Sequence, residues 1–163
     1  MNKPNLEMAK QAAKTILSDF GLTEPPVNPA DIARHLGVVV KFVTFNENHS
    51  SISGFYDCED DAIYVNESEF PLRQTFTIAH ELGHRMMHRD WAASADYAIL
   101  MRDENVAKNK YEYEADEFAG HLLAPRFMLD KYISKASNAE LSRLFAISIP
   151  ALKVRLSKEY GII

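Results

Sequence analysis

The sequence predicts an α+β fold in which a small, mostly antiparallel three-stranded sheet packs against several helices. Three short β-branched or aromatic runs lie close together, at residues 38–43, 51–57 and 62–66, and segments with helical apolar spacing precede and follow them. The chain has 163 residues, 47% of them hydrophobic and 25% charged, which is typical of a globular protein with one principal core. We therefore expect a main domain over residues 1–125 and a helical extension over residues 126–163.

Two helices are expected before the sheet. Residues 5–20 place apolar side chains at helical spacing and stop at Gly21, a residue type that commonly ends helices. The next helix begins where Asn28 can cap it and Pro29 suits its first turn. Within the sheet, the turn-forming run "CEDD" at residues 58–61 predicts that the second and third strands form a hairpin.

Two further helices are expected after the sheet. Pro71 suits a helix start, and the apolar spacing that follows places "TIAHELGHRMMH", residues 77–88, on a helix. Residues 90–107 have weak periodicity and are expected to form a long loop with one helical turn. Helical spacing resumes over residues 111–123 until Pro125 interrupts it.

The tail is expected to form two short helices, capped by Asn138 and Ser148. It carries 7 Lys and Arg against 3 Asp and Glu, whereas residues 1–125 carry 11 against 20. Four basic side chains would contact phosphates if these helices read DNA: Arg143, Lys153, Arg155 and Lys158. The apolar residues between them leave few polar positions to read base edges, so nucleic acid is the less favoured partner.

Composition also indicates a cellular compartment. The sequence contains no run of about 18 apolar residues, the length that a membrane span needs, and its start lacks the apolar middle of a signal peptide. The single cysteine, Cys58, cannot form an internal disulfide, which is typical of a reducing compartment. We therefore expect a cytoplasmic protein without a membrane partner; the sequence gives no indication of its oligomeric state.

The helical stretch of residues 77–88 contains an H-E-x-x-H motif. Because residues four apart lie on one helix face, His80 and His84 can converge on one ion, and zinc prefers such nitrogen ligands. Glu81 is rotated by about 100° from His80, so it would lie beside the ion and take a proton from metal-bound water. The alternative is structural: two histidines satisfied on a buried face and a surface acid.

A second acidic helix strengthens the metal interpretation. Glu112 and Asp116 are four apart, so one can offer a carboxylate to the metal while the other orients a ligating histidine. Glu114 competes with Glu112 as third ligand, but two residues rotate it by about 200°, so only one of the two faces the metal. His88 lies two turns from His80, too far for the same ion, and is expected to be a solvated or core-edge histidine.

These segments resemble the ImmA/IrrE family of zinc metallopeptidases. The resemblance covers roughly residues 25–126 and is carried by "RQTFTIAHELGHRMMH" and "YEYEADEFAGHLLAP". It implies four site residues: His80, His84 and Glu112 as zinc ligands and Glu81 as general base. Asp116 stands where many relatives have Asn, and Ala124 where Met is common, so neither departure affects a ligand.

The expected reaction is hydrolysis of a peptide bond. The resemblance implies a regulatory protease that cleaves a specific protein, such as a repressor or an antitoxin-like transcription factor. The substrate is expected to lie extended along the strand of residues 62–66. Candidates to stabilise the oxyanion are His121, Tyr97, Tyr111 and Tyr113. The alternative is a zinc-bearing regulatory or DNA-binding module without peptidase activity.

Overall fold

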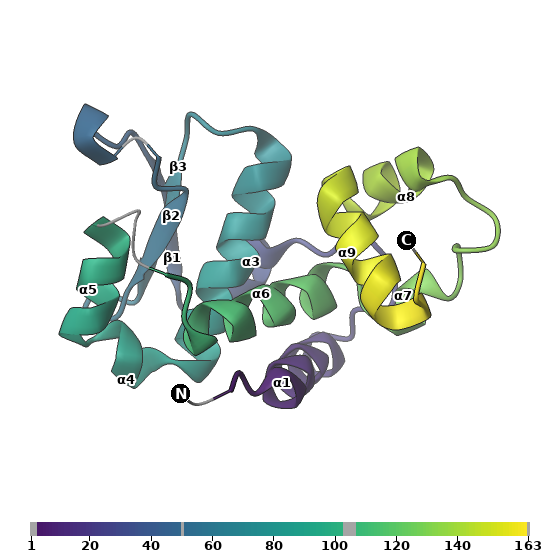
Figure 1. The fold of residues 1–163 in the computed structure, drawn as a ribbon, viewed down its shortest axis with the longest axis horizontal. Helices are drawn as coiled ribbons and strands as arrows, with labels where there is room; N and C mark the ends of the chain where they lie inside the picture. The colour runs from purple at the N-terminus through teal and green to yellow at the C-terminus, as the bar shows by residue number, and fades with distance from the viewer. Residues whose placement is uncertain (1–2, 50, 103–106, 163) are drawn as a thin grey trace.

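The computed structural model of the protein describes residues 3–49, 51–102 and 107–162 and confirms the α+β class (Figure 1). Its sheet contains β1 (Val39–Val43), β2 (Gly54–Asp57) and β3 (Ala62–Asn66), in the spatial order β1-β3-β2. β2 and β3 form the expected antiparallel hairpin, whereas β1 pairs with β3 in parallel.

The sheet is therefore mixed, and the expectation of a mostly antiparallel sheet was wrong for one of its two pairings. The chain leaves β1, passes through the short helix η1 (Glu47–His49), and reverses direction both before β2 and after it. Two reversals make β1 and β3 point the same way, and β3 then lies between the other two strands. Parallel pairing needs a longer connection than a hairpin, and η1 with β2 supplies it.

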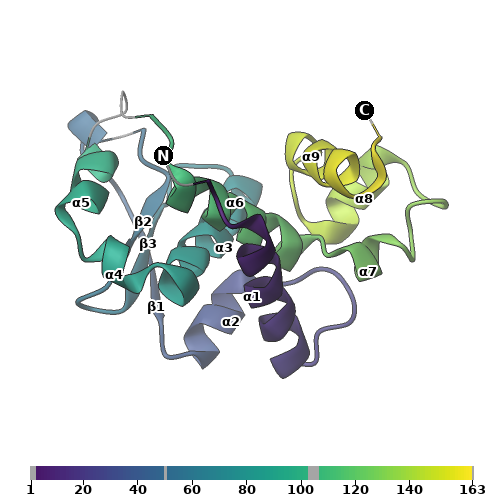
Figure 2. The same ribbon diagram turned by 60° about the horizontal axis from the view of Figure 1, so that its bottom comes forward.

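Four helices build the body around the sheet (Figures 1 and 2). α3 (Pro71–Met87) packs on β2 and β3, and α6 (Lys110–Leu123) crosses α3. α1 (Leu6–Asp19) lies along α6, while α2 (Pro29–His35) contacts α3 and β1. Across the described part of the chain, no helix combines the length and apolar character needed to cross a membrane.

The segment expected to be mainly loop is more helical than predicted. It forms α4 (Arg89–Ala92) and α5 (Ala95–Arg102), while residues 103–106 lie outside the described part of the chain. Trp91 and Tyr97 are buried there against the site helices. Two aromatic side chains anchor these short helices through tertiary packing, which local periodicity does not record.

The tail forms the two predicted helices, α8 (Asn138–Phe145) and α9 (Ile149–Tyr160), preceded by one turn, α7 (Arg126–Leu129). Ser148 caps α9 as expected, but Ser137 and not Asn138 caps α8, in a capping box with Glu140. α8 and α9 lie side by side at one end of the molecule (Figure 1), and their apolar side chains join the same buried cluster as those of α6. The division of the chain at residue 125 stays a prediction.

Candidate metal centre

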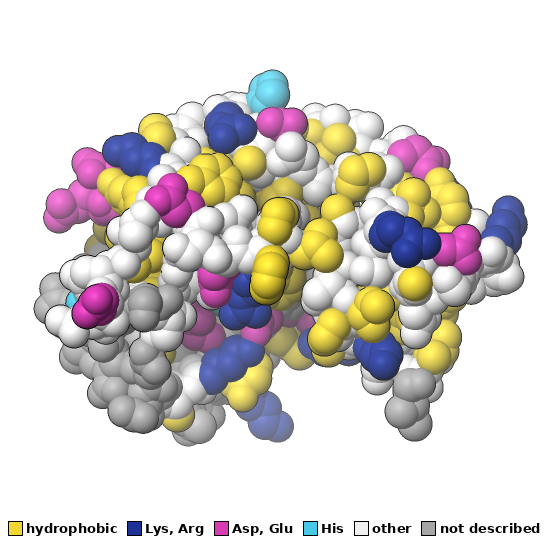
Figure 3. Space-filling view, turned by 90° about the horizontal axis from the view of Figure 1, so that it is seen from above, with side chains coloured by type: hydrophobic (Ala, Val, Ile, Leu, Met, Phe, Trp, Pro, Cys, Tyr) yellow, Lys and Arg dark blue, Asp and Glu magenta, His cyan; other side chains and the backbone are white. Residues whose placement is uncertain are grey.

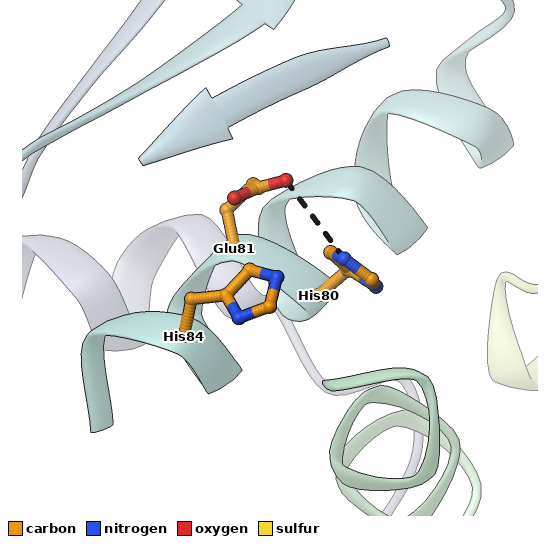
Figure 4. A group of neighbouring side chains, drawn as sticks. All are labelled: His80, Glu81 and His84. Carbon is orange, nitrogen blue, oxygen red and sulfur yellow. Dashed lines mark ion pairs between the residues drawn. The ribbon is translucent and has the colours of Figure 1, made fainter. Parts of the chain in front are cut away.

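Helix α3 directs the two motif histidines toward α6. The apolar residues Ile78, Ala79 and Leu82 are buried, and the potential ligand atoms of His80, Glu81 and His84 lie within 4.8 Å of one another (Figure 4). α6 comes close because residue 83 is glycine: a Cβ atom there would lie 2.9 Å from the ring of Phe118. The close crossing of the two helices brings the acidic residues of α6 to the histidines of α3.

The carboxylate of Glu112 spans the two motif histidines. Its Oε2 lies 3.2 Å from Nε2 of His80, and its Oε1 lies 2.8 Å from Nε2 of His84. Glu112 stands in the first turn of α6, where the side chain of Asn109 caps the helix by accepting a hydrogen bond from the Glu112 backbone N–H. Two nitrogens and one carboxylate from different helices thus converge on one point.

Asp116 contacts the opposite nitrogen of His80. One turn after Glu112, its Oδ1 lies 2.8 Å from His80 Nδ1, and its other oxygen pairs with Lys108. The structure therefore brings together five residues singled out in the sequence: His80, Glu81, His84, Glu112 and Asp116.

Glu81 is buried beside these groups, with 3% of its surface exposed. Its Oε1 lies 4.0 Å from His80 Nε2, and the hydroxyl of Tyr97 lies 3.4 Å from its Oε2. The same hydroxyl accepts a hydrogen bond from the backbone N–H of Tyr56, at 2.7 Å. Burial raises the pKa of Glu81 to about 8, partly opposed by the positive charge of His80.

The three converging side chains hold different charges. For His80, burial lowers the pKa, but hydrogen bonds to Asp116 and Glu112 outweigh burial and leave the pKa well above its usual value. Burial lowers the pKa of His84 to about 4. For Glu112, burial raises the pKa, but the two histidines outweigh burial and hold it well below its usual value. At neutral pH Glu112 is an anion and His84 is a neutral imidazole with a lone pair to donate.

His88 and Glu114 lie behind His84, and both are buried. His88 Nδ1 is 2.9 Å from His84 Nδ1, and its Nε2 is 2.8 Å from Oε1 of Glu114. Burial lowers the pKa of His88 although Glu114 opposes the shift. Glu114 thus points at His88 and not at the ligand nitrogens, and of the two expectations for His88 the solvated one was wrong, because the side chain is buried. In the sequence, the contact between His84 and His88 was indicated by their four-residue spacing, the same spacing that separates His80 from His84.

The four residues considered from the sequence as oxyanion-stabilising candidates do not all lie at the site. Tyr97 contacts Glu81, whereas His121 lies near α9 within reach of Arg155, Glu117 and Glu159. The ring of Tyr111 stacks on Trp91, and the half-exposed Tyr113 lies under the ammonium of Lys108. Of these four side chains, Tyr97 is the one that contacts Glu81 within the part of the chain that the structure describes.

The site opens into a cleft of about 490 Å³ that His80, Glu81, Glu112 and Asp116 line. Residues 51–54 also line the cleft, and of these Gly54 is the first residue of the edge strand β2. The expectation that a substrate lies along β3 was wrong, because β1 and β2 pair with β3 on both sides and leave it no free edge. Gly54 has no space for a side chain: a Cβ atom would lie 2.6 Å from Cγ2 of Thr77 and would collide with the carbonyl oxygen of Tyr64.

A smaller apolar pocket of about 160 Å³ adjoins the cleft, because Phe76 and Asp116 line both. The side chains of Leu123, Ile147 and Val154 add apolar walls from α6 and the C-terminal helices. In the view from above, hydrophobic side chains gather in the middle of the molecule over α3 and α9 (Figure 3). A mainly apolar pocket beside α9 thus lies next to the polar groups of the cleft.

Comparison with known proteins places this chain in a family. A Peptidase M78 family model, described as an IrrE N-terminal-like domain, matches residues 33–157. The uncharacterized immunity region protein 2 of Bacillus phage phi105 is 31% identical over 133 residues, which cover 80% of this chain and 77% of that protein. The radiation response metalloprotease IrrE of Deinococcus deserti is 25% identical over 161 residues, which cover 88% of this chain and 51% of that protein.

A solved structure of a Mycobacterium tuberculosis transcriptional regulator has the same fold. It superposes over 93% of this chain with a TM-score of 0.67 and 19% sequence identity, and the match covers 46% of the regulator. The chain thus spans about half the length of the regulator and of the Deinococcus protein. The family match and the metalloprotease relative support a metallopeptidase kind of function. The protein is a member of the ImmA/IrrE family, with the IrrE N-terminal-like peptidase domain over residues 33–157.

Proposed function

We propose that this chain is a zinc-dependent metallopeptidase that cleaves a specific protein, such as a transcriptional regulator. One observation carries the proposal: the Glu112 carboxylate lies 3.2 and 2.8 Å from Nε2 of His80 and His84, with the buried Glu81 alongside. Catalytic zinc sites use three protein ligands and keep a fourth position for water. His80, His84 and Glu112 supply such a set.

The donor atoms fit zinc in chemistry and in spacing. Zinc binds imidazole nitrogen and carboxylate oxygen at about 2.0–2.2 Å, so ligand atoms around a tetrahedral ion lie about 3.4 Å apart. The observed separations of 3.2 and 2.8 Å between carboxylate oxygens and imidazole nitrogens need only a small opening. The neutral state of His84 also suits metal binding, because a ligating imidazole must have lost one proton.

The residues around the proposed zinc have separate roles in hydrolysis. When bound, zinc would polarise the scissile carbonyl and lower the pKa of a coordinated water. Glu81, buried beside Nε2 of His80, is placed to take a proton from water held there and to pass it to the leaving amine. The Tyr97 hydroxyl fixes one oxygen of Glu81, and Asp116 fixes the ring of His80.

The substrate would lie extended along β2. In an antiparallel pair, alternate residues turn their main-chain groups toward the partner strand. The Ser53 carbonyl accepts a hydrogen bond from Asn66, whereas the Tyr56 N–H faces away from β3, toward Tyr97. Gly54 lies two residues before Tyr56, so its main-chain groups also face away from β3. They face the cleft and can pair with a peptide.

The C-terminal helices give little support to the DNA-binding alternative. Arg155 is buried, donates to the Ala124 carbonyl and pairs with Glu159. Lys158 pairs with Glu117. Two of the four side chains considered for phosphate contacts therefore have partners inside the protein. A zinc-bearing module without peptidase activity is the alternative that experiment must exclude.

Metal analysis of purified protein tests the ligand set. Wild type should hold about one zinc per chain, and His84→Ala and Glu112→Ala should each lose most of it. His49→Ala, at a half-buried histidine outside the site, is the control and should keep the metal. Full zinc occupancy in both ligand variants would overturn the ligand assignment.

The substrate is sought with an inactive variant. Glu81→Gln keeps all three proposed ligands, so it should retain zinc and hold its partner without cleaving it. Proteins captured on Glu81→Gln in cells that encode this chain are then incubated with wild type. A captured regulator that wild type cuts and Glu81→Gln leaves intact supports the protease, and partners that neither protein cuts support the binding module.

A further inference from the structure

We propose that His88, Glu114 and the backbone N–H of Asn5 form a positioning chain that presents Nε2 of His84 to the metal. The start of helix α1 thereby becomes part of the support of the metal site. The inference rests on the proposed metal-binding function, and it adds residues that the H-E-x-x-H motif does not include.

The chain of contacts is continuous. The Asn5 N–H donates to Oε2 of Glu114 at 2.6 Å, and Oε1 of Glu114 lies 2.8 Å from Nε2 of His88. Nδ1 of His88 then lies 2.9 Å from Nδ1 of His84. The exposed fractions are 0% for His84 and 4% for both His88 and Glu114, so water does not compete for these contacts. Short contacts among buried polar groups are strong and demand full pairing.

The Asn5 N–H and the Glu114 carboxylate give the hydrogen bonds of the chain one consistent direction. A backbone N–H can only donate, and an ionised carboxylate can only accept. Nε2 of His88 therefore donates its proton to Glu114, and Nδ1 of the same ring is placed to accept a hydrogen bond from His84. That nitrogen accepts the Nδ1–H of His84, so Nε2 of His84 keeps its lone pair. This lone pair and Oε1 of Glu112 face each other at 2.8 Å, an arrangement that a shared cation stabilises.

Aromatic packing keeps the ring of His88 in this orientation. The ring centroids of His88 and Tyr111 are 5.0 Å apart at an interplanar angle of 73°, and Trp91 stacks on Tyr111 at 4.5 Å. The ring of His84 also lies against Trp91, at 5.2 Å. Rotation of either imidazole would disturb this aromatic cluster, so the hydrogen-bonded orientation is also the packed one.

The N-terminal end of the chain is equally well fixed. Asn5 caps α1, because its side chain accepts a hydrogen bond from the backbone N–H of Met8 at 3.0 Å. α1 lies along α6, the helix that carries Glu114, and both views show them side by side (Figures 1 and 2). The position of α1 therefore determines whether Glu114 has its second donor. The two motif histidines are thus held differently, His80 directly by Asp116 and His84 through a second histidine.

The first test compares two acids on α6 that each pair with a histidine. Glu114→Gln leaves one amide oxygen for two donors, so the chain cannot be satisfied. It should raise the zinc dissociation constant about 10- to 100-fold in a chelator competition, the usual effect of losing a partner of a ligating histidine. Glu117→Gln removes the partner of His121, away from the site, and should leave the constant within about twofold of wild type.

The second test isolates the contribution of α1. Asn5→Ala and Asn5→Pro both remove the capping side chain, but only the proline removes the N–H that Glu114 accepts. Asn5→Pro should therefore bind zinc several-fold more weakly than Asn5→Ala, whereas equal affinities would show that the N–H has no part in the site. This pair remains informative if Glu114→Gln fails to fold.

Nitrogen-15 NMR of the imidazoles reports the proton positions directly. Zinc-loaded wild type should show protonated Nδ1 on His84, protonated Nε2 on His88, and a coupling across the hydrogen bond between their Nδ1 atoms. Protonated Nδ1 on His88 would overturn the inference. If wild type binds zinc and Glu114→Gln has the same zinc dissociation constant as Glu117→Gln, the positioning chain alone is overturned. If wild type does not bind zinc, the proposed function is overturned.

Discussion

Nδ1 of His80 lies 2.8 Å from Oδ1 of Asp116, one helical turn beyond Glu112 on α6. This contact holds the imidazole so that its other nitrogen, Nε2, faces Glu112. Asp116→Ala should fold and raise the zinc dissociation constant about 10- to 100-fold in chelator competition. Asp19→Ala, at an exposed acid of α1, is the control. Equal zinc affinity of the two variants would make Asp116 an ordinary helix acid.

Tyr97→Phe should destabilise the fold near the site. The Tyr97 hydroxyl accepts the backbone N–H of Tyr56, and without it that N–H is left unpaired in a buried strand. An unsatisfied buried donor costs about 1–3 kcal/mol, so the free energy of unfolding in urea should fall by that amount. Tyr113→Phe, at a half-exposed ring, should change it by less than about 0.5 kcal/mol. Equal effects would show that water satisfies Tyr56.

Gly54→Ala should damage the wall of the cleft. The added Cβ would lie 2.6 Å from Thr77 Cγ2 and against the Tyr64 carbonyl, which the hairpin holds in place. We expect a loss of about 2 kcal/mol or more in the free energy of unfolding, because backbone cannot move aside as a side chain can. Thr77→Ala in the same background should recover only part of the loss. Full recovery would show that Thr77 alone closes this space.

The stability of the protein should depend on Glu117 in acid. A hydrogen bond from His121, helped by the ion pair with Lys158, lowers the Glu117 pKa to about 2 from the ordinary value of 4.5. A carboxyl whose folded-state pKa is depressed stabilises the fold above its unfolded pKa and loses that effect as the pH falls through the folded pKa.

Wild type should therefore exceed Glu117→Gln in the free energy of unfolding at pH 7, by about 1–2 kcal/mol after allowance for screening. The difference should shrink between pH 4.5 and pH 2. Urea titrations at pH 7 and pH 3 measure it. A difference that is the same at both pH values would contradict the assigned ion pair.

Local spacing was enough to predict the motif helix and the acidic helix. His80 and His84 share a face of α3, and Glu112 and Asp116 share a face of α6, because side chains four apart align on any helix. The hairpin of β2 and β3 was equally local, since four turn residues connect the two strands. The resemblance to the ImmA/IrrE family is confirmed by the family match.

Features that depend on distant partners could not be predicted. The parallel pairing of β1 with β3 joins strands that are not consecutive, so no turn signal marks it. α4 and α5 depend on the burial of Trp91 and Tyr97, which a weak apolar period does not reveal. His88 and Glu114 lie 26 residues apart, and only the crossing of α3 with α6 brings them together.

The appearance of new N-termini in the proteins of cells that encode this chain tests directly whether the chain is a peptidase that uses Glu81. Zinc-loaded wild type and zinc-loaded Glu81→Gln are incubated with the same extract, and new N-termini are counted by mass spectrometry. We expect a small set of cleavages by wild type that Glu81→Gln produces at least about a hundredfold more slowly, since general-base catalysis contributes about that factor or more. Identical N-termini with wild type and Glu81→Gln, both fully loaded with zinc, would contradict this expectation.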